Sequence, residues 1–99
     1  MNVAVIGASD KPERYSYRVC MLLKEKGHRI FPVHGRITDI EGMTVYPSIL
    51  DVPQDIDTVS MYVAPDKSSQ IAADILQVHP KRIIFNPGAE NPDLAEQAR

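Results

Sequence analysis

Four short, largely apolar runs stand out along this 99-residue sequence, each followed within two residues by glycine or proline. Runs of this length are typical of strands buried on both faces, as in parallel sheets. The pattern predicts strands over residues 3–6, 29–33, 58–63 and 82–85.

Segments with helical spacing separate these runs. In the first, Tyr15, Val19, Leu22 and Leu23 fall on one face, with Ser16 as the expected N-cap and Gly27 as the stop. In the second, which follows Ala64-Pro65-Asp66 and ends at Pro80, the shared face holds Ile71, Ile75 and Val78. A third helix is predicted from Asn91-Pro92-Asp93, which combines an N-cap, a proline at the first helical position and an acid in the first turn.

Strands that alternate with helices favour a parallel sheet covered on both faces. Right-handed crossovers place the two βαβ halves side by side, so we expect an α/β, Rossmann-like three-layer α/β/α fold. A loop over residues 34–44 and a short helical turn over 46–50 connect the halves. We interpret residues 1–99 as one domain that lacks a last C-terminal strand or helix, because the sequence ends only a few residues into a helical pattern.

The net charge of −2 hides an asymmetry along the chain. Residues 1–36 hold seven Lys and Arg against three acids, whereas residues 37–99 hold four against ten. A locally basic first third suits a small polyanion, and the overall acidity disfavours a broad nucleic-acid footprint. No apolar run approaches the ~18 residues of a membrane span, so we expect no membrane association and a cytoplasmic location.

Ligands of open α/β sheets bind beyond the carboxyl ends of the strands, where the strand order reverses. Here that point lies between the first strand and the strand that begins near Thr58, and it gathers residues 7–16, 33–36, 63–67 and 86–90. The first of these loops carries small residues, a hydroxyl, two cations and a helix start, which together predict a phosphate site. These residues are Gly7, Ala8, Ser9, Lys11, Arg14 and Ser16.

The type of phosphate ligand follows from what the loops contain. No second glycine precedes Gly27, so the dinucleotide fingerprint G-x-G-x-x-G is absent. The second strand ends in His34-Gly35-Arg36 instead of the carboxylate that would hold an NAD ribose. A cation there favours a ligand with an extra phosphate, such as NADP or coenzyme A.

A resemblance to a known family begins in the same loop. Residues 3–14, VAVIGASDKPER, resemble the opening of the small stand-alone CoA-binding proteins, which are related to the CoA-binding domain of the succinyl-CoA synthetase alpha subunit. The likeness continues in order through residues 30–33, 46–53 and 56–59. It implies the Rossmann-like fold already inferred, and binding of coenzyme A or an acyl-CoA.

The resemblance also implies a role for individual positions. It assigns the diphosphate to Gly7, Ala8, Ser9, Arg14 and Ser16, and the adenosine and 3′-phosphate end to Val33, His34 and Arg36. It places Val63, Ala64, Pro65 and Lys67 on the opposite wall. The family commonly has Asn-Pro-Lys/Arg where this chain has His34-Gly35-Arg36. The synthetase domain with the phosphorylated histidine has no counterpart, so the resemblance implies binding rather than ligase activity.

No catalytic or metal constellation is visible in the sequence. Cys20 lies among apolar helix residues and is interpreted as buried filler, and the three histidines lack metal-ligand spacing. Glu90 lies near the expected site without a visible partner. Two alternatives remain beside a CoA-binding protein: an NADP-linked oxidoreductase fragment and a ligand-free interaction scaffold. A homodimer is left open.

Overall fold

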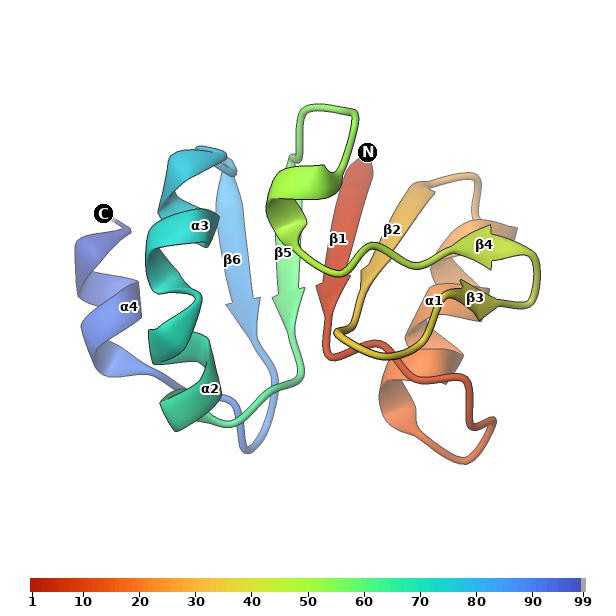
Figure 1. Cartoon of the computed structure of the whole chain (residues 1–99), viewed down its shortest axis with the longest axis horizontal. Coiled ribbons are helices and arrows are strands. Elements are labelled where there is room, and N and C mark those ends of the chain that lie inside the picture. Colours follow the sequence, from red (N-terminus) through yellow and green to blue (C-terminus); the bar gives the residue numbers. More distant parts are fainter. Residues whose placement is uncertain (99) are drawn as a thin grey trace.

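The fold is centred on a four-stranded parallel sheet, seen in a computed structural model that describes residues 1–98 (Figure 1). Its order is β2-β1-β5-β6, so the reversal between β1 and β5 lies where the sequence predicts it. The strands are β1 (Asn2–Ile6), β2 (Arg29–Val33), β5 (Thr58–Met61) and β6 (Arg82–Phe85). The predicted Rossmann-like α/β architecture is confirmed.

Helices cover the two faces of the sheet. Figure 1 shows α1 (Tyr15–Glu25) on the far side, and α2 (Pro65–Gln70), α3 (Ala72–Gln77) and α4 (Pro92–Gln97) on the near side. Each side encloses its own apolar cluster, because successive strand residues point to opposite faces. Val3 and Val5 pack toward α1, whereas Ala4 and Ile6 pack toward α3.

Helix α1 begins one residue before the predicted N-cap, and its buried face differs from the predicted one. Arg14 is the N-cap, and Ser16 lies buried inside the first turn. Tyr15 and Leu22, expected to face the core, are 76% and 51% exposed. The buried positions are instead Ser16 and Cys20, small side chains that allow the helix to lie close to the sheet.

The second predicted helix is divided in two. The backbone of Ile71 departs from helical geometry at φ −109° and ψ 8°, and this residue separates α2 from α3. Its predicted apolar face is confirmed, since Ile75 is fully buried and Ile71 and Val78 pack beside it. The predicted start of α4 is also confirmed, because the Asn91 side chain accepts a hydrogen bond from the Leu94 N–H.

The connector between the two halves contains more structure than the predicted loop. Two short strands, β3 (Asp39–Ile40) and β4 (Met43–Thr44), form an antiparallel hairpin that lies beside β2. The chain then forms a bridge from Tyr46 to Val33 and enters the 3-10 helix η1 (Ile49–Asp51). This path places η1 on the same face of the sheet as α3.

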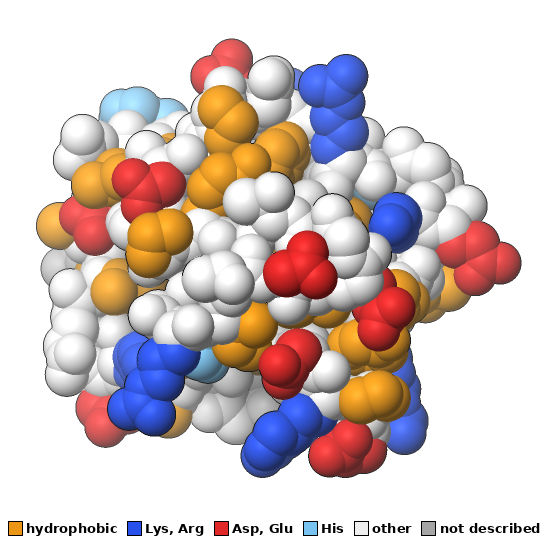
Figure 2. All heavy atoms as spheres, turned by 45° about the vertical axis from the view of Figure 1, so that its right-hand side comes forward, with side chains coloured by type: hydrophobic (Ala, Val, Ile, Leu, Met, Phe, Trp, Pro, Cys, Tyr) orange, Lys and Arg blue, Asp and Glu red, His pale blue; other side chains and the backbone are white. Residues whose placement is uncertain are grey.

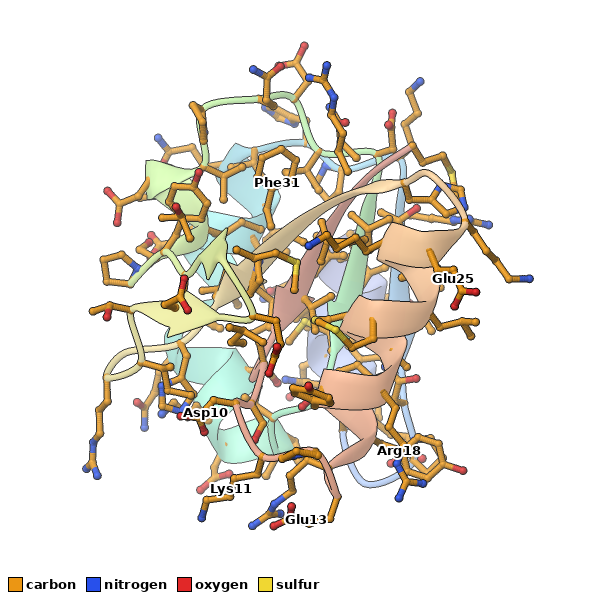
Figure 3. The ribbon with its side chains drawn as sticks, turned by 90° about the vertical axis from the view of Figure 1, so that its right-hand side faces the viewer. Asp10, Lys11, Glu13, Arg18, Glu25 and Phe31 are labelled. Atoms are coloured by element: carbon orange, nitrogen blue, oxygen red, sulfur yellow. The ribbon has the colours of Figure 1, made fainter. Side chains whose placement is uncertain are left out.

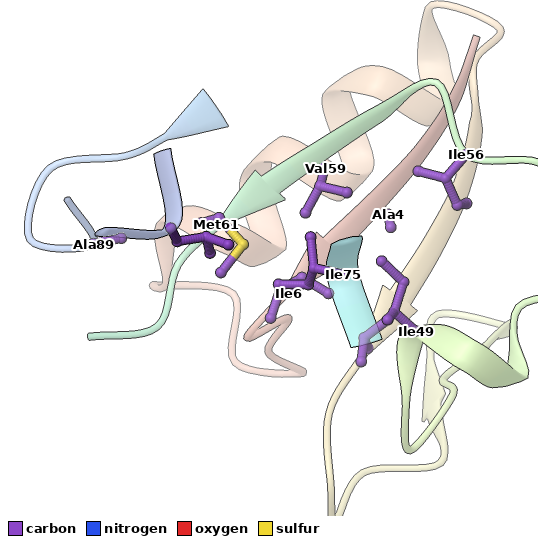
Figure 4. Packing of buried hydrophobic residues seen from close by; sticks show 10 residues of the cluster. Ala4, Ile6, Ile49, Ile56, Val59, Met61, Ile75 and Ala89 are labelled. Carbon is purple, nitrogen blue, oxygen red and sulfur yellow. The ribbon is translucent and has the colours of Figure 1, made fainter. Parts of the chain in front are cut away.

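The larger apolar cluster joins η1 and α3 to the sheet (Figure 4). Ile75 of α3, Ile49 of η1 and Ile6 of β1 are at most 3% exposed. Because these three side chains belong to one packed cluster, they hold η1 and α3 beside each other on this face of the sheet. Among residues 1–98, no helix is long and apolar enough to cross a membrane.

Candidate functional site

A cleft of about 830 Å³ opens at the carboxyl ends of β1, β2 and β5. The loop between β1 and α1, the loop after β2, η1 and the α2–α3 pair surround it. Its lining comprises Ile6, Gly7, Ala8, Ser9, Asp10, Lys11, Arg14, Tyr15, Ser16, Val33, His34, Gly35, Arg36, Ile37, Pro47, Ser48, Ile49, Tyr62, Val63, Lys67, Ile71 and Asp74. The cleft therefore lies at the reversal of strand order that the sequence indicates.

Gly7 makes the turn from β1 into the cleft loop. Its φ is +86°, a conformation that side chains other than hydrogen rarely adopt, and a Cβ there would stand 2.8 Å from Cγ1 of Val63. The N–H groups of Gly7 and Ala8 both donate to the Val33 carbonyl, at 3.0 and 3.3 Å. These two residues thus extend the β1–β2 pairing and bring the following loop close to β5.

The start of α1 faces the cleft without a capping side chain. The first N–H groups of a helix have no acceptor within the helix, and the N-cap residue usually supplies one. Here the N-cap is Arg14, which makes no side-chain cap hydrogen bond. Upstream, the Ser9 hydroxyl accepts from the Lys11 N–H at 3.1 Å and holds the loop in a turn. The geometry leaves backbone donors of the first helical turn available to an anion.

Four cationic side chains line the same cleft: Lys11, Arg14, Arg36 and Lys67. The one ion pair among residues 1–98 joins Lys81 to Asp57, and neither residue lines the cleft. None of the four cations is therefore neutralised by a carboxylate of the described chain. In Figure 3, Lys11 projects outward from the loop before α1, with Arg18 further along the helix. Lys and Arg side chains lie along the lower edge of the face in Figure 2, with Asp and Glu side chains among them.

The loop after β2 is shaped by His34. Its Nδ1 accepts hydrogen bonds from the N–H groups of Arg36, at 3.0 Å, and of Ile37, at 3.3 Å. Because Nδ1 is the acceptor, the neutral ring carries its proton on Nε2. This ring therefore orients the backbone that carries Arg36 and offers a further donor atom.

The remaining walls of the cleft are mostly apolar. Val63, Ile49 and Ile71 line it together with Tyr62, whose phenol has a pKa raised by burial and stays protonated at neutral pH. Asp74, in the first turn of α3, and Asp10 are the two acids of the described lining.

Most of the residues predicted from the sequence come together in this cleft. Ala64 and Pro65 do not line it, because they lead into α2 while their neighbours Val63 and Lys67 face it. Residues 86–90, expected at the same edge, also lie outside the lining.

Several lining residues lie outside the segments that the sequence placed at the site: Ile6, Ile37, Pro47, Ser48, Ile49, Tyr62, Ile71 and Asp74. The predicted helical turn at residues 46–50 was a signal for three of these, but only the Tyr46–Val33 bridge places it over the strand ends.

The prediction that Cys20 is buried in the interior is confirmed. The side chain is fully buried, and burial raises the pKa of its thiol from 9.0 to about 11. A thiol in this setting is protonated at neutral pH and is a poor nucleophile. Among residues 1–98, no cluster of three or more His, Cys, Asp or Glu side chains has an arrangement that could hold a metal ion.

Together, fold and cleft define a Rossmann-like domain with a cation-lined cleft at its switch point. The whole chain, residues 1–99, matches the family model described as the CoA binding domain, and the chain belongs to this family. Membership supports coenzyme A binding in general.

The acetate–CoA ligases among the curated relatives are much longer than this chain. The alpha subunit of an ADP-forming acetate–CoA ligase II from Pyrococcus furiosus is 36% identical over 66 residues, which are 66% of this chain and 14% of the subunit. The chain therefore spans about one-seventh of that relative.

Solved structures share the fold over nearly the whole chain. A hypothetical protein from Pyrococcus horikoshii has a TM-score of 0.92 at 30% identity, and the match covers 97% of this chain and 68% of that one. A dinucleotide-forming acetyl-coenzyme A synthetase from Candidatus Korarchaeum cryptofilum, in complex with phosphate and ADP, has a TM-score of 0.77 at 25% identity. That match covers 98% of this chain and 22% of the synthetase.

Proposed function

We propose that the cleft binds coenzyme A or an acyl-CoA, and that the protein acts as a binding module without catalysing a reaction itself. The observation that carries the proposal is that four cations without a carboxylate partner line the same cleft as the uncapped start of α1. Such a site offers backbone donors, a positive helix end and charge-assisted partners to a polyphosphate.

The diphosphate is assigned to the loop over residues 7–16, with Arg14 and the first turn of α1 as its partners. The 3′-phosphate is assigned to Arg36, which the His34 ring orients. Val33 lies beside them, and Val63 and Lys67 form the opposite wall. This arrangement uses every phosphate group of coenzyme A and explains why cations stand on both sides of the cleft.

Titration calorimetry with coenzyme A tests the assignment through Arg14→Ala. Removal of a hydrogen-bond partner from a charged group costs roughly 1.5–3 kcal/mol, so we expect binding to weaken about tenfold to hundredfold. Arg18→Ala is the matched control, because Arg18 lies in the helix that Arg14 caps and does not line the cleft, and its side chain donates to the Pro12 carbonyl. Equal affinity of wild type and Arg14→Ala would overturn the diphosphate assignment.

A second pair of ligands separates coenzyme A from other phosphates. Arg36→Ala should weaken the binding of coenzyme A but leave the binding of 3′-dephospho-coenzyme A unchanged. The second ligand lacks the 3′-phosphate that is assigned to Arg36. Stabilisation of the wild type by NADPH but not by coenzyme A would support an oxidoreductase instead. A dimer that binds none of these ligands would support an interaction scaffold.

A further inference from the structure

Asp74 is an exception in a cleft dominated by cations. It lines the cleft from the first turn of α3 and is half-buried. No hydrogen bond or ion pair joins its side chain to any other residue within the described part of the chain. A partly exposed carboxylate without a protein partner has its oxygens free to accept a hydrogen bond from a ligand in the cleft.

The position of Asp74 along the helices separates it from the phosphate end. Lys67, Ile71 and Asp74 follow one another at helical spacing and all line the cleft. Because α3 follows α2 in the direction away from the carboxyl ends of the strands, Asp74 lies further from these ends than Lys67 does (Figure 1). Going away from the strand ends, this row of side chains therefore changes from cationic at Lys67 through apolar at Ile71 to anionic at Asp74.

This order matches a ligand whose charged and uncharged parts are separate. A carboxylate repels phosphates, so Asp74 must face an uncharged group that carries an N–H or O–H donor. The walls beside it are the apolar side chains of Ile71 and Ile49, which suit a flat ring. An adenine ring has one donor, its exocyclic amino group, and a carboxylate oxygen is a matching acceptor.

On this basis, which rests on the proposed function, we propose that the Asp74 carboxylate accepts a hydrogen bond from the exocyclic amino group of the ligand's adenine. The site then selects aminopurine ligands and rejects purines without a donor at that position. A site that hydrogen-bonds a polar substrate group discriminates strongly against an analogue that lacks it, because its own polar atom is left unpaired.

The test compares adenosine 3′,5′-bisphosphate with the same bisphosphate of unsubstituted purine, which lacks the amino group. Both probes keep two phosphate groups and omit the pantetheine arm. We expect the wild-type chain to bind the adenine compound roughly tenfold to hundredfold more tightly. Asp74→Ala should bring the ratio close to one, and Asp74→Asn, which keeps a neutral acceptor, should give an intermediate ratio.

Asp66→Ala is the matched control, because Asp66 is an exposed acid of α2 that does not line the cleft. It should leave the ratio unchanged. A wild-type chain that binds both probes equally, or an Asp74→Ala chain that keeps the wild-type ratio, overturns the assignment. So does a loss of coenzyme A affinity in Asp74→Ala without loss for the bisphosphate, which would place Asp74 at the pantetheine amides.

These results separate the two proposals. Tight binding of coenzyme A without discrimination at the amino group refutes only the role of Asp74. Failure of the wild type to bind coenzyme A and both bisphosphates refutes the proposed function and, with it, the role of Asp74.

Discussion

The backbone N–H of Arg36 donates a 3.0 Å hydrogen bond to Nδ1 of His34, two residues earlier in the chain. The N–H of Ile37 donates to the same atom at 3.3 Å. The imidazole thus closes a turn directly after β2, and this turn sets the direction in which Arg36 leaves the backbone. Gly35, which has no side chain to pack, contributes little to the rigidity of the turn.

His34→Leu should loosen this turn. Loss of one or two hydrogen bonds costs about 1–2 kcal/mol, so coenzyme A binding should weaken about 5- to 30-fold. His34→Asn keeps a short acceptor that favours such turns, and it should retain most of the affinity. Amide hydrogen exchange of Arg36 and Ile37 measures the turn directly in the free protein. Unchanged exchange in His34→Leu would show that the imidazole does not hold this turn.

Gly7→Ala should destabilise the fold more than Gly88→Ala. Both glycines have a left-handed φ, +86° and +88°, but only at Gly7 would a Cβ meet other atoms, Cγ1 of Val63 at 2.8 Å and the backbone carbonyl carbon of Tyr62 at 3.3 Å. The conformational strain costs roughly 1–2 kcal/mol at either site. The clash adds about 1–3 kcal/mol at Gly7, by analogy with overpacked cores.

Urea unfolding of both variants measures this difference. Val63→Ala removes the nearest of these atoms, so the double variant Gly7→Ala/Val63→Ala should cost less than the sum of its parts. Equal losses for Gly7→Ala and Gly88→Ala would show that the contacts of the new Cβ at Gly7 cost nothing beyond the backbone strain that both variants share.

Asn91 ties the start of α4 to the α2 segment. Its amide nitrogen donates to Oγ of Ser68 at 2.7 Å and of Ser69 at 3.0 Å, while its Oδ1 caps α4 through the Leu94 N–H. Asn91→Ala removes the cap and the donors at a residue that is 5% exposed, so unfolding free energy should fall by about 2–4 kcal/mol.

The two functions of Asn91 can be separated with a second variant. Asn91→Asp keeps the cap oxygen and loses the amide donors, so its loss of stability should be smaller than that of Asn91→Ala. Identical denaturation midpoints for the two variants would mean that the amide donors, not the cap, account for the stability.

The parallel sheet and its switch point could be predicted because each strand is an uninterrupted apolar run with glycine or proline after it. The hairpin could not, because its strands are two residues long, too short for periodicity to register. Its turn at Glu41 and Gly42, with φ of 48° and 84°, has the left-handed pair that two-residue hairpins require. Gly42 alone indicated only a loop.

The N-cap of α1 shows why local preference was insufficient. A serine N-cap is worth about 1 kcal/mol, which tertiary packing can outweigh. Ser16 is instead buried in the first turn of the helix, four residues before the equally small Cys20. Tertiary packing also explains why some lining residues could not be predicted from local sequence. Ile49 and Asp74 reach the cleft only through the packing of η1 against α3.

Cys20 makes stability depend on alkaline pH. Burial raises the pKa of its thiol from 9.0 to about 11, so the folded state disfavours the thiolate while the unfolded chain ionises near the ordinary value. The full stabilisation is therefore present below pH 9.0 and is lost as pH rises toward about 11. At about 1.4 kcal/mol for each pKa unit, the total loss is roughly 2–3 kcal/mol.

Urea midpoints of the wild type should thus fall between pH 8.5 and 10.5, measured with a reductant present, over the range in which the unfolded thiol ionises. Cys20→Ala lacks the titrating group and should show a shallower decline, from a starting stability lowered by the smaller side chain. A neutral thiol reagent should react with Cys20 only as fast as the chain opens. Parallel pH profiles for wild type and Cys20→Ala would show that the thiol is not the group responsible, and that other groups, such as Tyr62 with its raised pKa, govern the alkaline limit.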